Sequence, residues 1–390
     1  MSFLGGFFLY KKIICFIVLL SIIGVNNSVF AKSDVRNSTV LITFKEKVDK
    51  ELIFKYKGEV LESYENLPIV RVEIPSNVID DLALNNLIEG VEIDNNIKIS
   101  NQGSDFKFSL SDHSLQTMSW GFEKIQVPSV HKYNITGKNV SVAIIDTGID
   151  IYHEDLHVNG GISFLDYTTS YHDDNGHGTH IAGIVGALDN DKGIIGVAPD
   201  VDLYSVKALD KEGNGKYSNV IKGIDWAINN DIKIISMSIN GIQESISFEK
   251  ATELAYKKGI LLVSSAGNKG YFNENSIMIP AKYDSVISVG ALDEENQRWE
   301  FSSRGKELEL MAPGVDILST FLNGSYIKDS GSSMAAAYVT GLAALIMEKN
   351  PLLSNQQVRE ILQNNAEKLG ITNEYGYGLI NAIQSINSIN

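Results

Sequence analysis

The stretch Asp329-Ser-Gly-Ser-Ser333-Met-Ala-Ala-Ala-Tyr-Val-Thr-Gly341 places a serine in a tight turn of small residues that leads directly into a helix-forming segment. The turn exposes the hydroxyl of Ser333, and the free N–H groups at the start of the next helix lie where an oxyanion could form. A serine hydroxyl is unreactive at its own pKa and needs a base and an acid that orients the base. The stretch therefore predicts a nucleophile if the chain supplies both partners.

Two further motifs, one with an aspartate and one with a histidine, meet this condition. Val142-Ala-Ile-Ile-Asp146-Thr-Gly-Ile-Asp150 is typical of a buried strand that breaks at Asp146 into a glycine-containing turn. Open α/β sheets build their active sites at such carboxyl ends of strands. Asn175-Gly-His177-Gly-Thr-His180-Ile-Ala-Gly-Ile-Val-Gly-Ala187 places His177 on a turn at the start of a small-residue helix. We therefore expect His177 to be the base and Asp146 to orient it.

With these motifs the chain resembles the secreted serine proteases of the subtilisin family, in which aspartate, histidine and serine follow one another in this order. Other motifs in the family's order are Gly213-Asn-Gly-Lys-Tyr217-Ser, Ser264-Ser-Ala-Gly-Asn268-Lys-Gly270, Met311-Ala-Pro-Gly314 and Tyr375-Gly-Tyr-Gly-Leu-Ile-Asn381. The resemblance covers nearly the whole length. It implies an endopeptidase that hydrolyses peptide bonds through an acyl-enzyme, with Asn268 and the N–H of Ser333 binding the oxyanion.

The first 31 residues have the charged, apolar and small-residue parts of a secretory signal. These parts are Lys11 and Lys12, the apolar run Ile13 to Val25, and Val29-Phe-Ala31. We expect cleavage after Ala31 and a secreted protein. A membrane anchor is the alternative, but the run is shorter than the ~20 residues of a spanning helix.

Composition limits the partners of the chain. Its only cysteine, Cys15, lies in the predicted signal, so the secreted form has no disulfide. The net charge of −15 argues against a nucleic-acid partner, because phosphate binding needs a basic face. We expect a monomer that binds peptide or protein substrates and has no membrane span once the signal is removed.

Residues 37–97 have the β-α-β-β-α-β pattern of a small domain. Apolar alternation predicts strands at Thr39–Phe44, Leu67–Ile74 and Gly90–Ile93. Helices are expected between and after them, at Val48–Tyr56 and Ser76–Leu84. The pattern resembles the ferredoxin-like propeptide of subtilisins, which implies that this region inhibits the catalytic domain. An unrelated N-terminal domain is the alternative. Residues Asn95 to Leu115 are polar and lack periodicity, so we expect an exposed linker over 98–115 in which maturation cuts occur.

Residues 116–390 alternate between short apolar runs and helical patterns, which predicts an α/β fold. The predicted strands are Val140–Ile145, Val201–Val206, Ile232–Met237, Ile260–Ser265 and Val286–Val289, and the helices are Gly178–Ala187, Asn219–Asn230, Ser247–Lys258 and Met334–Lys349. This pattern favours a doubly wound, mostly parallel sheet with helices on both faces. Ser354-Asn-Gln-Gln357 is a capping box that begins another helix.

The resemblance also implies a structural calcium site. The residues at the family's positions are Gln116, Asp155, Leu188, Asn190, Lys192 and Ile194, which offer side-chain and backbone oxygens. A plain polar turn is the alternative. A zinc site at His177 and His180 lacks a third ligand, so we expect His180 to be structural. The remaining histidines, His113, His131, His153, His157 and His172, are expected at the surface.

Two extended segments are expected to form the walls of the substrate cleft by pairing with the bound peptide. By resemblance they are Ser238-Ile239-Asn240-Gly241 and Ser265-Ala266-Gly267, with Tyr217 facing a more distant subsite. Asn240 stands where the family has glycine, and Ala337 and Tyr338 replace a Pro-His pair; we expect the helix after Ser333 to survive.

Lys269 and Met278 bear on which residue precedes the cleaved bond, the P1 residue. By resemblance Lys269 lies at the mouth of the P1 pocket and Met278 near its base, so Lys269 could favour an acidic P1. Some relatives that remove lanthipeptide leaders cleave after glutamate, which makes a dedicated processing peptidase the alternative to a general protease. Against it, Ile93 to Leu115 contains no glutamate for self-maturation. A pseudoprotease that only binds peptides is a third hypothesis, opposed by the intact motifs.

Overall fold

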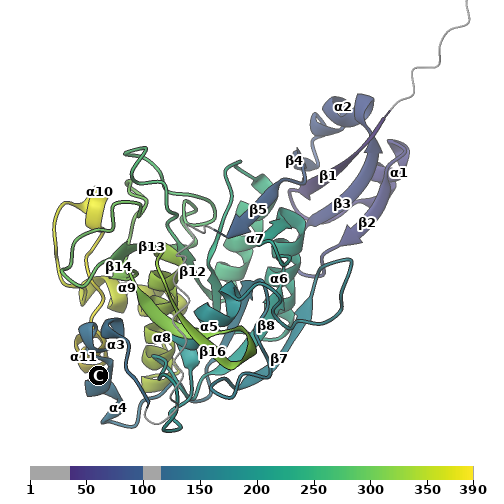
Figure 1. Ribbon diagram of the computed structural model, residues 1–390. Helices are drawn as coiled ribbons and strands as arrows, with labels where there is room; N and C mark the ends of the chain where they lie inside the picture. The colour runs from purple at the N-terminus through teal and green to yellow at the C-terminus, as the bar shows by residue number, and fades with distance from the viewer. Residues whose placement is uncertain (1–35, 100–115, 390) are drawn as a thin grey trace, which may run out of the picture. The chain divides into compact units, whose positions relative to one another are not determined.

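The computed structural model of the chain describes residues 36–99 and 116–389 (Figure 1). The predicted signal, His113 and most of the predicted linker lie outside these residues. Within them, no helix is both long and apolar enough to cross a membrane.

A seven-stranded parallel sheet forms the centre of the fold, in the order β14-β13-β12-β10-β6-β8-β7. Its strands are β6 (Ser141–Asp146), β7 (Val158–Ser163), β8 (Asp202–Lys207), β10 (Ile234–Met237), β12 (Leu261–Ser265), β13 (Ile287–Leu292) and β14 (Leu310–Pro313). The two strands at its centre, β10 and β12, are mostly apolar and fully buried, as a parallel sheet covered on both sides requires.

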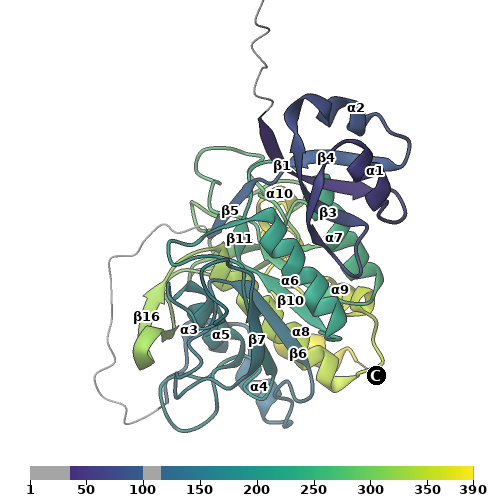
Figure 2. The same ribbon diagram turned by 90° about the vertical axis from the view of Figure 1, so that its right-hand side faces the viewer.

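Helices cover both faces of this sheet (Figure 1). Along β6, Val142 and Ile144 pack into the cluster that includes α5 (His177–Gly186), α8 (Ser332–Lys349) and α9 (Asn355–Asn364). Ala143 and Ile145 pack on the other side against α6 (Tyr217–Asn229) and α7 (Ile246–Lys257), which run side by side in Figure 2. The short helices are α3 (Trp120–Lys124), α4 (Val127–His131), α10 (Thr372–Tyr375) and α11 (Ala382–Asn387).

The predicted doubly wound α/β fold is confirmed, with all five predicted strands and four predicted helices present. The two edge strands, β7 and β14, are not among the predicted strands. β7 reads Val-Asn-Gly-Gly-Ile-Ser and has no apolar run, and β14 is only four residues long. The capping box before α9 is confirmed, since Ser354 Oγ accepts from Gln357 N and Gln357 Oε1 accepts from Ser354 N.

Residues 36–93 form the predicted ferredoxin-like unit, which we call the N-terminal module. It contains β1 (Asn37–Phe44), α1 (Lys50–Lys55), β2 (Glu59–Ser63), β3 (Ile69–Pro75), the 3₁₀ turn η1 (Ser76–Val78), α2 (Ile79–Ala83) and β4 (Ile88–Ile93). The sheet is antiparallel in the order β2-β3-β1-β4 and has its own apolar core. β2 is the one strand of this sheet for which no segment was predicted.

The segment after the module is a strand, β5 (Asn96–Ile99), between β9 (Asn214–Lys216) and β11 (Ile239–Asn240). The prediction of an exposed polar segment from Asn95 onward is therefore wrong for this strand, because Ile97 and Ile99 are buried. Its partners lie more than a hundred residues away in sequence and gave no local signal. A hairpin of β15 (Ile317–Phe321) and β16 (Ser325–Asp329), joined by the 3₁₀ turn η2 (Leu322–Gly324), leads to Ser333.

Candidate active site

Asp146 and His177 form a buried pair at the carboxyl end of β6. Asp146 is the last residue of that strand, and His177 is the first residue of α5. His177 Nδ1 lies 2.8 Å from Asp146 Oδ1 and 3.0 Å from Oδ2, and the N–H of Thr147 also donates to Oδ1. A Cβ on Gly178 would lie 2.1 Å from the carbonyl oxygen of Gly148, so only glycine lets α5 begin this close to the strand end.

The electrostatics of this pair favour the protonated imidazole. Burial of the His177 ring lowers its pKa, but the charge and hydrogen bond of Asp146 outweigh burial, and the pKa lies above the ordinary 6.5. Asp329 and Asp173 raise the pKa further. Such a histidine can accept a proton and hold the resulting charge, as a general base must.

Ser333 lies in the first turn of α8 and is almost fully buried. Its Oγ is 3.5 Å from the carbonyl oxygen of Ser238. His177 Nε2 has no hydrogen-bond partner among the described residues, so the serine and the histidine are not joined in this structure. Catalytic hydrogen bonds are often long without substrate and tighten when it binds.

The side-chain amide of Asn268 is fixed by Ser332, the residue before the candidate nucleophile. Asn268 Oδ1 accepts from Ser332 N at 3.1 Å and from Ser332 Oγ at 2.8 Å, and Gly267 N donates to Ser332 Oγ. A Cβ on Gly331 would lie 3.2 Å from Asn268 Nδ2, so the amide nitrogen is next to the turn before α8. Ser332 stands inside the motif around Ser333, but its type alone gave no sign of this role.

The two segments expected to form the walls of the cleft, residues 238–241 and 265–267, both lie near the turn before α8. Ser238 Oγ donates to the carbonyl oxygen of Ser333, and Gly241 exchanges backbone hydrogen bonds with Ile279. In the second wall, the N–H of Ala266 donates to Val289 O, and the carbonyl oxygen of Ala266 accepts from Met278 N. Every residue expected in the walls, Ser238, Ile239, Asn240, Gly241, Ser265, Ala266 and Gly267, is buried. Lys269 is exposed beside them.

β5 lies along the first expected wall as an added strand. On one side it pairs antiparallel with β11 (Ile99 opposite Ile239, Lys98 opposite Asn240), and on the other with β9 (Ile97 opposite Gly215). Tyr217 is fully buried, and it belongs to the same apolar cluster as Ile97 and Ile99.

The residues that precede β5 hold the starts of two helices. The carboxylate of Glu92 accepts from Ser245 Oγ at 2.6 Å and from the N–H groups of Ile246 and Ser247 at 3.0 Å, at the N-terminus of α7. A carboxylate there satisfies free N–H groups and interacts favourably with the helix dipole.

Two other aspartates extend this contact along α6. Asp94 accepts from Ser218 N and Ser218 Oγ at the start of that helix. Asp225, within α6, accepts from the backbone N–H groups of Glu65 and Asn66 in the N-terminal module, both at 2.8 Å. The module is thus bound to both helices through buried or half-buried charged hydrogen bonds.

The six residues expected to hold calcium lie together. Gln116 Nε2 is 2.6 Å from the carbonyl oxygen of Leu188 and 3.0 Å from that of Ile194, so these carbonyls converge on one point. Asn190 Nδ2 donates to Asp155 Oδ1, and Asn190 Oδ1 accepts from Lys192 N. Turning either amide would direct its oxygen where its nitrogen now lies.

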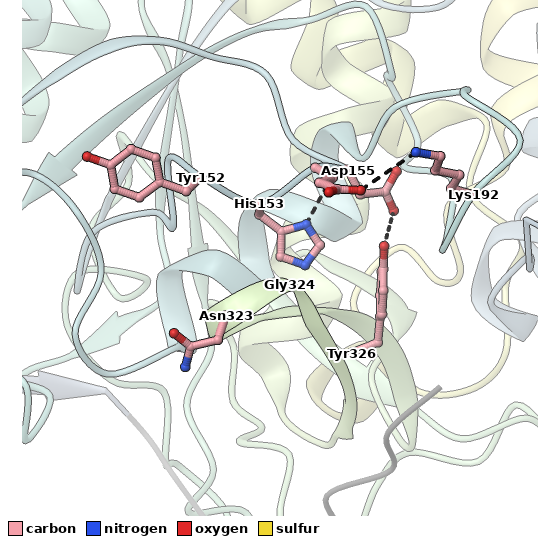
Figure 3. Close-up of a pocket in the computed structure, with 8 residues that line it drawn as sticks. Tyr152, His153, Asp155, Lys192, Asn323, Gly324 and Tyr326 are labelled. Carbon is pink, nitrogen blue, oxygen red and sulfur yellow. Dashed lines mark hydrogen bonds and ion pairs between the residues drawn. The ribbon is translucent and has the colours of Figure 1, made fainter. Parts of the chain in front are cut away.

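Asp155 borders a hollow of about 500 Å³ (Figure 3). Figure 3 shows the Tyr326 hydroxyl directed at the Asp155 carboxylate, to which it donates at 3.1 Å. Burial raises the pKa of Asp155 to about 6. No group of three or more His, Cys, Asp or Glu side chains suited to a metal occurs in the described ranges, but calcium sites can be built mainly from carbonyl and amide oxygens.

Two histidines near these sites are buried. His180 Nε2 donates to the carbonyl oxygen of Ile327, and burial lowers the pKa of His180 to about 4, so the ring stays neutral. The prediction that His153 lies at the surface is wrong, because its ring is buried beside Tyr326 and its Nε2 bonds to Ser325 O.

The helix after Ser333 survives the two unusual residues, as expected. α8 continues through Ala337 and Tyr338 to Lys349. The Tyr338 hydroxyl is within hydrogen-bond distance of Ser119 Oγ at 3.0 Å, which ties α8 to the start of α3.

Comparison with known proteins places the chain in a family. A model of the Subtilase family matches residues 137–378. Subtilisin DY of Bacillus licheniformis is 48% identical over 267 residues, 68% of this chain and 97% of the relative. The alkaline protease of Alkalihalobacillus alcalophilus is 39% identical over 324 residues, 83% of this chain and 80% of the relative.

The minor extracellular protease Epr of Bacillus subtilis (strain 168) is 40% identical over 347 residues, 87% of this chain. The matched part is 53% of Epr, so the chain spans about half the length of that relative. Together with the α/β fold, these matches show that the chain belongs to the subtilase family of serine endopeptidases.

Proposed function

We propose that the chain is a secreted endopeptidase that uses Ser333 as nucleophile, His177 as general base and Asp146 to orient the base. The observation that carries the proposal is the buried His177–Asp146 pair, 2.8 Å apart, at the start of α5, a helix that packs against α8 with Ser333 in its first turn. The signal-like residues 1–31 support secretion, and one relative is named an extracellular protease.

The proposed reaction follows from this arrangement. Ser333 Oγ attacks the substrate carbonyl while His177 Nε2 takes its proton, and Asp146 holds Nδ1 and stabilises the imidazolium. Asn268 Nδ2 and the Ser333 N–H donate to the oxyanion. His177 then gives its proton to the leaving amine, and water hydrolyses the acyl-enzyme by the same route in reverse.

We further propose that residues 36–99 are an inhibitory propeptide. β5 occupies the first wall of the cleft, where a substrate strand would pair, and the carboxylates of Glu92 and Asp94 bind the starts of α7 and α6. A strand held in this way competes with substrate for the same backbone hydrogen bonds.

The site around Asp155 fits a structural calcium ion. Converging carbonyl oxygens from Leu188 and Ile194, the amides of Gln116 and Asn190 and one buried carboxylate are the hard donors that calcium takes. The carbonyl of Lys192 belongs to the same loop. The ion would link residue 116 to this loop and neutralise Asp155.

The narrower hypotheses gain no support. The relatives described above are named subtilisin, alkaline protease and extracellular protease, which does not favour a dedicated leader peptidase. The intact Asp146–His177 pair likewise gives no reason to prefer a pseudoprotease.

Ser333→Ala is expected to lower kcat/KM on a peptide substrate at least ~10⁴-fold, the scale of loss known for triad residues of subtilisins themselves. The measurement is hydrolysis of a mixed peptide library by the purified mature protein. Ser330→Ala, the same change three residues earlier, should leave kcat/KM within about threefold. Equal activity of Ser333→Ala and the unchanged protein would refute the proposed nucleophile.

The activity should rise with pH through the pKa of His177, because only the neutral imidazole can accept the proton of Ser333. Since that pKa is raised, half of the maximal kcat/KM is expected above pH 6.5. Asp329→Asn removes one of the charges that raise the pKa without altering the pair, so it should move the midpoint down by a few tenths of a pH unit. Glu295→Gln, an exposed control, should not move it; a profile that falls as pH rises through this range would contradict the role of His177.

Glu92→Gln should loosen the N-terminal module, because it removes the charge that three donors at the start of α7 now share. A lost charge-assisted bond costs about 1–3 kcal/mol, which corresponds to roughly tenfold or more in opening. We would measure digestion of residues 36–99 by trypsin in the full-length Ser333→Ala protein. Glu51→Gln, in the first turn of α1, is the control, and equal rates for both variants would argue against this docking.

Calcium should raise the melting temperature of the Ser333→Ala protein, and chelation by EDTA should lower it. An ion at 100 times its Kd stabilises by about 2.7 kcal/mol. Asp155→Asn should remove most of this difference, whereas Asp191→Asn, an exposed position in the same loop, should keep it. The calcium proposal fails if EDTA leaves the melting temperature of the Asp155-containing protein unchanged.

A further inference from the structure

We infer that the P1 pocket accepts small, uncharged polar side chains, such as serine, threonine or asparagine, because Met278 fills its base and the amide of Asn240 lies unpaired in its wall. This inference rests on the proposed function and adds its specificity. It depends on two side chains of this chain, one that takes up space and one that needs a hydrogen-bond partner.

Asn240 faces the side of its wall on which the nucleophile lies. Side chains of an extended segment alternate, so Ser238 and Asn240 point to one side and Ile239 to the other. Ser238 Oγ contacts the backbone of Ser333, whereas Ile239 packs in the apolar cluster with α6 and α7. The amide of Asn240 is therefore on the reactive side of the cleft.

This amide is buried without a partner. Asn240 is 3% exposed, and neither its Oδ1 nor its Nδ2 has a hydrogen-bond partner among the described residues. Asparagine carries two donors and an acceptor, and leaving them unpaired in a buried site is unfavourable. A bound peptide with a hydroxyl or amide beside Asn240 would satisfy them, whereas an apolar one would not.

The strand register indicates which part of a substrate meets this amide. Lys98 of β5 stands opposite Asn240, and directly opposite residues of an antiparallel pair share a face of the sheet. Consider the substrate residue that would stand opposite Asn240, in the place of Lys98. The residue two positions after it is a diagonal neighbour of Asn240, within reach of the Asn240 side chain. We take that residue as the P1 residue of a peptide bound in the register of β5.

Met278 takes up the space that a large P1 side chain would need. Its backbone is held by Ala266, with Met278 N donating to Ala266 O at 2.9 Å. Its side chain lies against Gly267: a Cβ at that glycine would be 2.7 Å from Met278 Cγ and 2.9 Å from Sδ. Gly267 itself has a φ of +102°, which other residues rarely adopt.

Lys269 offers the competing explanation, an acidic P1. Its side chain is exposed and borders a surface hollow of about 300 Å³, which Met278 also lines. Lys282 and Glu244 form an ion pair at the same hollow. An exposed ammonium is screened by water and contributes little, whereas the amide of Asn240 is shielded by burial. We therefore favour Asn240 over Lys269 as the group that recognises P1.

The test uses the mature enzyme at a concentration fixed by active-site titration with a fluorophosphonate. Peptides copy residues 96–99 and vary the next residue, which is serine in the sequence, among Ser, Asn, Ala, Glu, Lys and Phe. We expect kcat/KM for Ser and Asn to exceed that for Ala by about tenfold and that for Phe by about 100-fold or more.

Two variants assign the effects to the two side chains. Met278→Gly should raise cleavage after Phe about 100-fold and leave cleavage after Ser within about threefold. Asn240→Leu, close in size but apolar, should abolish the advantage of Ser over Ala and keep Phe excluded. Lys269→Gln should change neither ratio.

Three outcomes would overturn the inference. If the unchanged enzyme prefers Phe or Leu at P1, its P1 pocket is open and apolar. If it cleaves only after Glu, Lys269 and not Asn240 recognises the P1 residue. If the Asn240→Leu enzyme still prefers Ser over Ala at P1, the amide of Asn240 is not the group that recognises P1. Each of these leaves the protease intact, whereas titrated enzyme that cleaves no peptide, or no better than Ser333→Ala, refutes the proposed function itself.

Discussion

The buried carboxylate of Asp146 is the constraint on which the rest of the fold depends. A buried charge is strongly unfavourable unless it is paired and hydrogen-bonded. Asp146 is fully buried and is compensated by Thr147 N and His177 Nδ1. The bond to His177 requires α5 to begin against the end of β6, which is why glycine is needed at position 178. The central strand, the start of α5 and the protonation of His177 are thus parts of one electrostatic arrangement.

The cleft shows a second constraint, the unpaired edges of its short strands. β9 and β11 present backbone donors and acceptors that need a partner, and β5 provides one by pairing with both. In the function proposed above, a substrate would pair with these same edges, which the chain itself occupies in this structure. Glu92 and Asp94 add hydrogen bonds at the starts of α7 and α6, so this strand is held by more than its pairing with β9 and β11.

The sequence predicts those parts of the molecule whose signals are local. The inner strands are apolar runs, and the elements of the site stand in motifs such as that around Ser333, so the fold class and the neighbourhood of His177 and Asp146 could be predicted. β5 could not, because four residues with two isoleucines become a strand only through partners that are distant in sequence. The 3.5 Å contact of Ser333 Oγ with Ser238 O, in place of a bond to His177, is likewise set by tertiary packing.

Asn240 and Met278 show why specificity is harder to predict than chemistry. Each could be recognised as unusual from its place in a motif, but the sequence did not show that Met278 packs on Gly267 or that the amide of Asn240 is buried without a partner. A catalytic group is identified by its type, because few side chains can perform its role. A pocket is defined by the volume and hydrogen bonds left over after packing, and these depend on neighbours from separate segments of the chain.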